Sequence, residues 1–174
     1  MDYHMVLQQL ASNQQSFQCL LSDVPQQLIR WKATPEQWCL LEIICHLRDI
    51  EKDDFRIRLQ LVLEDSTQDP PPIFPETWAQ KRAYMEQDFA ETTTSFLSER
   101  EQSIQWLRNL LASDPAPKWD NTYQHRQLGP LSAHLYLVNW LAHDYLHIRQ
   151  ITKVKYDYLK DASGESLAYA GKWV

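Results

Sequence analysis

Glycine is scarce in this sequence, in which only three of 174 residues are glycine. Tight hairpin turns depend on glycine, whereas the abundant leucine, glutamine, glutamate and alanine favour helices. No stretch approaches the roughly 18 apolar residues of a membrane span, and the N-terminal residues lack the basic and apolar regions of a targeting peptide. These absences predict an all-α protein, and we expect it to be soluble and to have no membrane partner.

Cysteine and basic residues are also limited. The three cysteines form no CxxC motif, and their odd number argues against a disulfide framework, so a reducing cytoplasm is the simplest compartment. The net charge is -6 and the pI is about 5.5. Because no basic stripe is available to neutralise phosphates, we expect no nucleic-acid partner. A neutral or cationic small molecule is compatible with this charge.

Apolar residues recur at spacings of three and four in four segments, which predicts a four-helix bundle. The predicted helices cover residues 3–22, 40–63, 77–111 and 131–156. The third helix is expected with or without a bend at residues 92–94. A long crossover loop over residues 65–76 joins the second and third helices, and an irregular stretch over 119–130 precedes the fourth. We expect a single domain over 1–174, with its core over about 3–156 and a tail over 157–174.

Two histidines lie four residues apart in the fourth predicted helix, which is apolar on several sides. This spacing places His143 and His147 on one side of the helix, one turn apart. In the second predicted helix, His46 falls at the edge of the stripe that faces the bundle. Two helices can therefore bring three imidazoles to one metal ion. Three protein ligands leave a coordination position open, as in catalytic zinc sites.

Hydrogen bonding is the alternative explanation for the buried histidines, because a buried ring nitrogen needs a partner of some kind. Several polar side chains on neighbouring turns could provide it. They are Glu42, Asp49, Tyr136, Asn139 and Gln150. The residues alone leave both explanations open.

Three segments resemble the signatures of DinB-like proteins, and the resemblance covers most of the chain. They are residues 38–47 (WCLLEIICHL), 125–132 (HRQLGPLS) and 143–151 (HDYLHIRQI). The resemblance implies a DinB/YfiT-like four-helix bundle in which His46, His143 and His147 bind one divalent ion, which could be zinc, nickel or manganese. One departure is Cys39 at the cap position, where the family commonly has serine or threonine. The family name implies no DNA chemistry.

The resemblance also implies a class of activity. Members of this superfamily include thiol S-transferases that use bacillithiol or mycothiol, and a mycothiol-dependent maleylpyruvate isomerase. We therefore expect a metal-dependent transferase or hydrolase that acts on a small molecule, with a low-molecular-weight thiol as a candidate partner. The alternative is a non-catalytic helical module in which the ion is structural. A homodimer through exposed helical faces is compatible with the sequence.

Two carboxylates near the first histidine are candidates for supporting roles. Asp49 lies three residues after His46 and is the better candidate to orient its ring, because metal-bound imidazoles usually donate their second nitrogen to a carboxylate or carbonyl. Glu42 could act as a base, but it lies three residues after Cys39, as in a capping box. We therefore favour a structural role for Glu42.

Three further residues are expected to be structural. Asp144 lies about 100° around the helix from its neighbour His143, so we expect it to pair elsewhere. His125 lies in the loop before the fourth helix, and a backbone hydrogen bond there is favoured over a place at the mouth of a pocket. Cys45 has no neighbour in sequence that would lower the pKa of its thiol, so we expect it to be buried and unreactive.

Overall fold

Four long helical segments form the body of the computed structural model, which describes residues 1–64, 70, 72–125 and 128–173. The first is α1 (Tyr3–Leu21), and the second joins α3 (Leu40–Ile50), η1 (Glu51–Phe55) and α4 (Arg56–Glu64) without a break. The third is α6 (Phe89–Leu111) and the fourth is α7 (Ala133–Ser163). Short elements complete the described chain: α2 (Gln26–Ile29), α5 (Pro75–Lys81), η2 (Tyr84–Glu86), β1 (Thr122–His125), β2 (Gly129–Ser132) and η3 (Ala168–Ala170).

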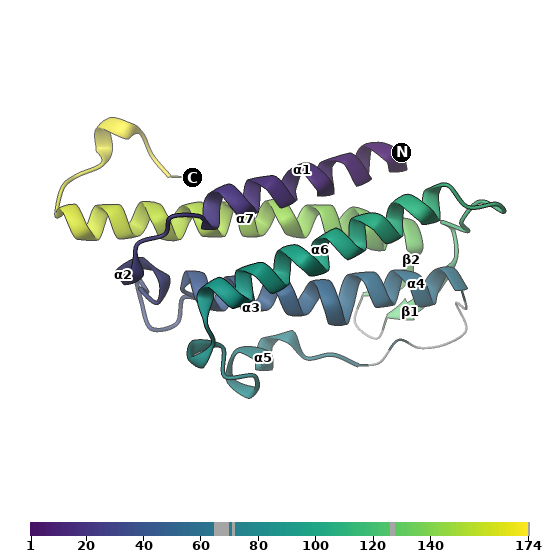
Figure 1. The fold of residues 1–174 in the computed structure, drawn as a ribbon, viewed down its shortest axis with the longest axis horizontal. Helices are drawn as coiled ribbons and strands as arrows, with labels where there is room; N and C mark the ends of the chain where they lie inside the picture. Colours follow the sequence, from purple (N-terminus) through teal and green to yellow (C-terminus); the bar gives the residue numbers. More distant parts are fainter. Residues whose placement is uncertain (65–69, 71, 126–127, 174) are drawn as a thin grey trace.

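The four segments pack as a bundle around one core, which confirms the predicted all-α four-helix architecture (Figure 1). Helix α1 contacts α6 and α7, α3 contacts α6, and α4 contacts α7. The interior is filled by apolar side chains from every long segment, for example Leu10, Ile43, Phe96 and Leu137. No helix among the described residues is long and apolar enough to cross a membrane.

Side-chain caps explain where the long helices begin. Asp2 Oδ1 accepts a hydrogen bond from the backbone N–H of His4 at 2.9 Å, and Ser132 Oγ accepts one from Leu135 at 3.1 Å. At the start of α3 the Cys39 backbone N–H donates to Glu42 Oε2 at 3.0 Å. Such bonds satisfy backbone groups that a helix end leaves without partners. The predicted starts near residues 3, 40 and 131 are therefore correct to within two residues.

The second segment contains a π-helical turn, which the apolar pattern does not predict. It covers η1, between α3 and α4. A π turn holds an extra residue, so the side chains after it are rotated relative to a regular α-helix. Phe55, the last residue of the turn, stacks on Trp140 of α7 with ring centroids 5.6 Å apart. The turn thus helps to fit this segment against α7.

The prediction of one long helix over 77–111 is wrong, because the chain breaks between α5 and α6. Ala83 has a φ of 47°, in the left-handed region that does not continue a right-handed helix. Asp88 then caps α6 by accepting from the Glu91 N–H at 2.9 Å. The break lets buried Tyr84 donate its hydroxyl to Asp49 Oδ2 at 2.8 Å. A tertiary hydrogen bond accompanies the interruption, and periodicity does not register it.

The region before α7 also differs from the prediction. An antiparallel hairpin of β1 and β2 occupies part of the stretch predicted to be irregular, and Gly129 in it has a φ of 75°. Helix α7 continues to Ser163 rather than ending at Tyr156, and it stops at Gly164, whose φ is 67°. Residues 65–69 and 71 of the predicted crossover, and 126–127 of the second signature, lie outside the described residues.

Candidate metal centre

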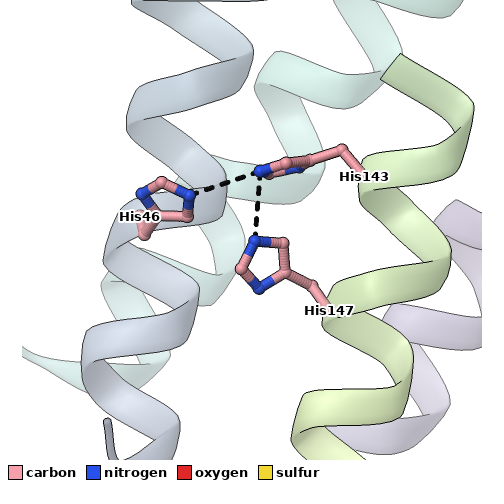
Figure 2. A group of neighbouring side chains, drawn as sticks. All are labelled: His46, His143 and His147. Carbon is pink, nitrogen blue, oxygen red and sulfur yellow. Dashed lines mark hydrogen bonds between the residues drawn. The ribbon is translucent and has the colours of Figure 1, made fainter. Parts of the chain in front are cut away.

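Three imidazoles meet between α3 and α7, as Figure 2 shows. His143 lies between the other two rings: its Nε2 is 3.3 Å from Nε2 of His46 and 3.1 Å from Nε2 of His147. All three potential ligand atoms lie within 4.8 Å of one another. The four-residue spacing on α7 and the position of His46 on the inner face of α3 produce this convergence.

The spacing of the nitrogens fits a small divalent ion. Zinc binds histidine nitrogen at about 2.0–2.1 Å with tetrahedral geometry, which places two ligand nitrogens about 3.4 Å apart. The 3.3 Å and 3.1 Å separations around His143 are close to that value. The described residues bring no cysteine or carboxylate into the cluster. The donor set is therefore three neutral nitrogen ligands, which suit zinc, nickel and related ions.

Burial keeps the three rings neutral, which is the form that binds metal. It lowers the pKa of His46 to about 3, with a further contribution from His147. It lowers the pKa of His143 to about 2, assisted by His147, His46 and the charge of Arg100. The pKa of His147 is also lowered by burial, although its hydrogen bond to Gln150 opposes the change.

The hydrogen bonds of the rings indicate which ring nitrogens carry a proton and which keep a lone pair. Gln150 Oε1 lies 2.8 Å from His147 Nδ1, and because an amide oxygen only accepts, this nitrogen carries the proton and Nε2 of the neutral ring does not. His46 Nδ1 is buried and has no hydrogen-bond partner among the described residues. Neutral rings alone satisfy these nitrogens poorly, whereas a cation at the meeting point would accept all three Nε2 lone pairs.

A cleft of about 510 Å³ opens beside the cluster, and we call it the histidine cleft. Its lining includes Trp31, Trp38, His46, His147, Gln150 and Lys153. The Trp38 ring lies 5.0 Å from that of His46, and on the other side of the cluster the Phe55 ring lies 5.3 Å from that of His143. Aromatic rings therefore contact His46 and His143, and the cleft gives access to His46 and His147.

Asp49 does not orient His46, contrary to the prediction. Its carboxylate instead accepts from Tyr84 and forms ion pairs with Arg48 at 2.7 Å and Arg82 at 2.8 Å. Asp49 lies three residues after His46 and is on the inner side of α3. The break after α5 brings Tyr84 and Arg82 into contact with the Asp49 carboxylate. Asp49 therefore joins α3 to the α5–η2 region.

Glu42 and Cys45 have the structural surroundings that we expected. Glu42 accepts the capping bond from Cys39 and forms an ion pair with Lys32 at 2.7 Å. Cys45 is fully buried, and burial raises the pKa of its thiol to about 11. A thiol with so high a pKa is protonated near neutral pH and is a poor nucleophile.

His125 holds the hairpin loop, because its Nδ1 accepts a hydrogen bond from the backbone N–H of Leu128 at 3.1 Å. It lines a separate cavity beside the hairpin rather than the histidine cleft. Asn139, an alternative partner for the histidine pair, instead donates to the backbone oxygen of Leu135 at 2.8 Å. Gln150, another of the alternative partners, does hydrogen-bond to a site histidine, His147.

A buried ion network next to the cluster was not predicted. Arg100 of α6 donates to Glu51 at 2.9 Å and to Asp144 at 2.6 Å and 2.7 Å, so Asp144 does pair away from the site. Burial opposes the charged guanidinium, but Glu51 and Asp144 more than offset it and raise the pKa of Arg100. The network fixes α7 at the residue that follows His143. Its sequence signal is the spacing of Arg100, four residues after Phe96 on the core stripe of α6.

The fold and the site together define a helical bundle with three convergent histidines at its centre. The sequence matches the DinB superfamily over residues 9–151, and the chain therefore belongs to that superfamily. Among solved structures it is similar to YfiT from Bacillus subtilis, which is described as a probable metal-dependent hydrolase with an unusual four-helix bundle topology. The alignment covers 94% of this chain and 89% of YfiT, with a TM-score of 0.75 and 16% identity. No curated protein matches the sequence.

Proposed function

We propose that this protein is a metal-dependent hydrolase that acts on a small molecule, with His46, His143 and His147 as the ligands of one divalent ion. The observation that carries the proposal is the meeting of three neutral Nε2 atoms beside an open cleft. The description of YfiT as a probable metal-dependent hydrolase favours hydrolysis over thiol transfer. The spacing of the nitrogens around His143 is compatible with zinc, and a three-histidine donor set also accepts nickel or manganese.

An ion with three histidine ligands and an open position supplies Lewis acidity and lowers the pKa of a bound water. The protein's own residues do the rest. Gln150 fixes the ring of His147 by accepting from its Nδ1–H, so Nε2 stays directed at the other two histidines. The Trp38 ring covers one side of His46 and offers an apolar surface to a substrate in the cleft.

Charged residues at the outer part of the cleft provide a place for polar substrate groups. Lys153 pairs with Asp157 one turn further along α7, and both side chains line the cleft together with Glu36. Because Lys153 is exposed to solvent, its pairing costs little to break and it can be shared with an anionic group. We therefore infer a small substrate with a polar group near Lys153 and an apolar part next to Trp31 and Trp38.

The test is hydrolysis of 4-nitrophenyl acetate by protein that has been stripped with chelator and then reloaded with zinc, nickel or manganese. We expect activity to depend on the metal and to be lost in His147→Ala. His4→Ala is the matched control, since His4 is exposed on α1 and outside the cluster, and it should retain full activity. Equal activity in stripped protein or in His147→Ala would contradict the proposal.

The same variants separate the other two functions. If His147→Ala loses the ion and its unfolding midpoint falls steeply, while no substrate is turned over by the wild type, the ion is a structural link between α3 and α7. Turnover of a chlorinated aromatic electrophile only in the presence of a low-molecular-weight thiol would instead identify a transferase. Either result would replace hydrolysis as the function.

A further inference from the structure

A second cavity lies between the β1–β2 hairpin, the end of η1 with the start of α4, and α7, and we call it the hairpin cavity. Its volume is about 610 Å³, within the range of small-molecule sites. It shares no lining residue with the histidine cleft among the described residues. In Figure 1 the two strands lie next to α4, β2 above it and β1 below it in this view, far along the bundle from α2. Phe55 lines the hairpin cavity and also contacts His143, so one aromatic ring separates the cavity from the cluster.

The rim of the hairpin cavity is apolar and exposed. Phe74, Leu128 and Leu135 line it, and their exposed fractions are 55%, 69% and 38%. They come from three places in the chain: the residue before α5, the hairpin and the first turn of α7. Single exposed apolar residues are common on protein surfaces, but a group that converges on one cavity marks a binding site. An apolar ligand would cover all three side chains at once.

The floor of the cavity is polar and buried. Arg58, Tyr123 and Tyr136 are each less than a tenth exposed and line the cavity. Arg58 Nε pairs with Asp54 Oδ1 at 2.7 Å, and its Nη1 donates to the Tyr123 hydroxyl at 3.4 Å. The guanidinium of Arg58 therefore already hydrogen-bonds to other side chains of the protein. Asp54 Oδ1 is paired with Arg58 in this way, and a carboxylate can accept several hydrogen bonds.

The charges that line the cavity favour a cation. Among the described residues that line the cavity, Asp54 and Glu76 carry negative charge, Arg58 carries positive charge, and His125 is titratable besides the tyrosines. Burial raises the pKa of Asp54 to about 6, and Arg58 limits that rise. A carboxylate ligand would meet an arginine that is already paired and two acidic groups. A protonated amine would give the half-buried Asp54 carboxylate a second charged partner.

We propose that the hairpin cavity is a second binding site, for a small molecule with an apolar body and one protonated amine. The amine bonds to Asp54 on the floor, and the apolar body packs against Phe74, Leu128 and Leu135 at the rim. The site is independent of the proposed hydrolysis, because the ligand does not reach the three Nε2 atoms behind Phe55. The proposed ligand is therefore an arylalkylamine or an alkylamine.

Calorimetric titration of the purified protein at pH 7.5 tests this assignment. The probes are 2-phenylethylamine, 3-phenylpropionate and 2-phenylethanol, which share an aromatic body and differ in charge. We expect the amine to bind at least tenfold more tightly than the other two. Equal binding of the amine and the carboxylate, or of the amine and the alcohol, would overturn the assignment of Asp54 as the recognition group.

Variants locate the binding site. Asp54→Asn should weaken amine binding at least tenfold, and Leu135→Trp, a change at a partly exposed position on the rim, should block the cavity and abolish binding. Asp157→Asn is the matched control, because Asp157 lines the histidine cleft and not the hairpin cavity. Circular dichroism checks that each variant is folded. Loss of amine binding in Asp157→Asn, or unchanged binding in folded Leu135→Trp, would refute the proposal.

Discussion

Replacing Arg100 with methionine tests the network that holds α6, η1 and α7 together. Arg100, Glu51 and Asp144 are each at most 1% exposed. After the change, Glu51 keeps one hydrogen bond from Trp140 Nε1 at 3.1 Å, and Asp144 keeps one from Asn13 at 3.2 Å. Removing one partner of a buried ion pair costs about 3–5 kcal/mol, and here two carboxylates lose their cation. We expect unfolding to become easier by about 4 kcal/mol, which lowers the midpoint by roughly 8–16 °C for a chain of this size.

Urea and thermal unfolding at pH 7 measure this effect. Arg108→Met is the matched control on the same helix, because Arg108 is exposed and should change stability by less than about 0.5 kcal/mol. The double variant Arg100→Met with Asp144→Asn should lose at least about 1.5 kcal/mol less than the sum of the single variants, since each removes part of the same interaction. A loss below about 1 kcal/mol for Arg100→Met would show that the network does not support the fold.

Three further predictions concern the histidines and two local contacts. The free energy of unfolding of the metal-free protein, measured in urea, should fall as the pH drops below about 6.5, because the unfolded chain takes up protons that the buried rings do not. The expected loss is up to about 1.4 kcal/mol per pH unit for each of the three site histidines. A flat profile between pH 7 and 5 would contradict their burial as neutral rings. Tyr84→Phe removes the buried donor to Asp49 and should cost about 1–2 kcal/mol in the same assay, and no loss would show that this bond is not needed. Asp88→Ala removes the cap of α6 and should cost about 1 kcal/mol by thermal unfolding, whereas an unchanged midpoint would argue against the cap.

Local signals in the sequence account for most of the fold. Apolar periodicity predicts four long helical segments, and the starts of the first, second and fourth are correct to within two residues. The break before α6 also had a signal, because Asp88 and Glu91 have the spacing of a capping pair. Apolar residues on both sides of the break continue a helical pattern, and for this reason periodicity predicts one unbroken helix there. The left-handed backbone of Ala83 has no such signal, since alanine rarely adopts it.

Tertiary contacts account for what the pattern misses. Arg100 occupies a core position of α6, but its partners Glu51 and Asp144 come from η1 and α7, so no local rule pairs them. The π turn of η1 is likewise a feature of packing against α7. Both features lie close to the histidines and determine how α3 and α7 face one another.

The site was predictable in part. The spacing of His143 and His147 and the inward position of His46 predict that the three rings lie together, and the structure brings them together. The prediction that Asp49 supports His46 failed because Tyr84 and Arg82 reach its carboxylate from another part of the chain. The hairpin cavity could not be predicted, because its walls meet only in the folded bundle. The role of the histidines as metal ligands is a proposal for experiment.

Anomalous diffraction from crystals of the protein grown with zinc is the most direct test of the central claim. We expect one anomalous peak per chain, within bonding distance of Nε2 of His46, His143 and His147, and no such peak in crystals of His147→Ala. A peak held by other residues, or none at the three histidines in zinc-saturated crystals, would contradict the assignment of this cluster as the metal centre.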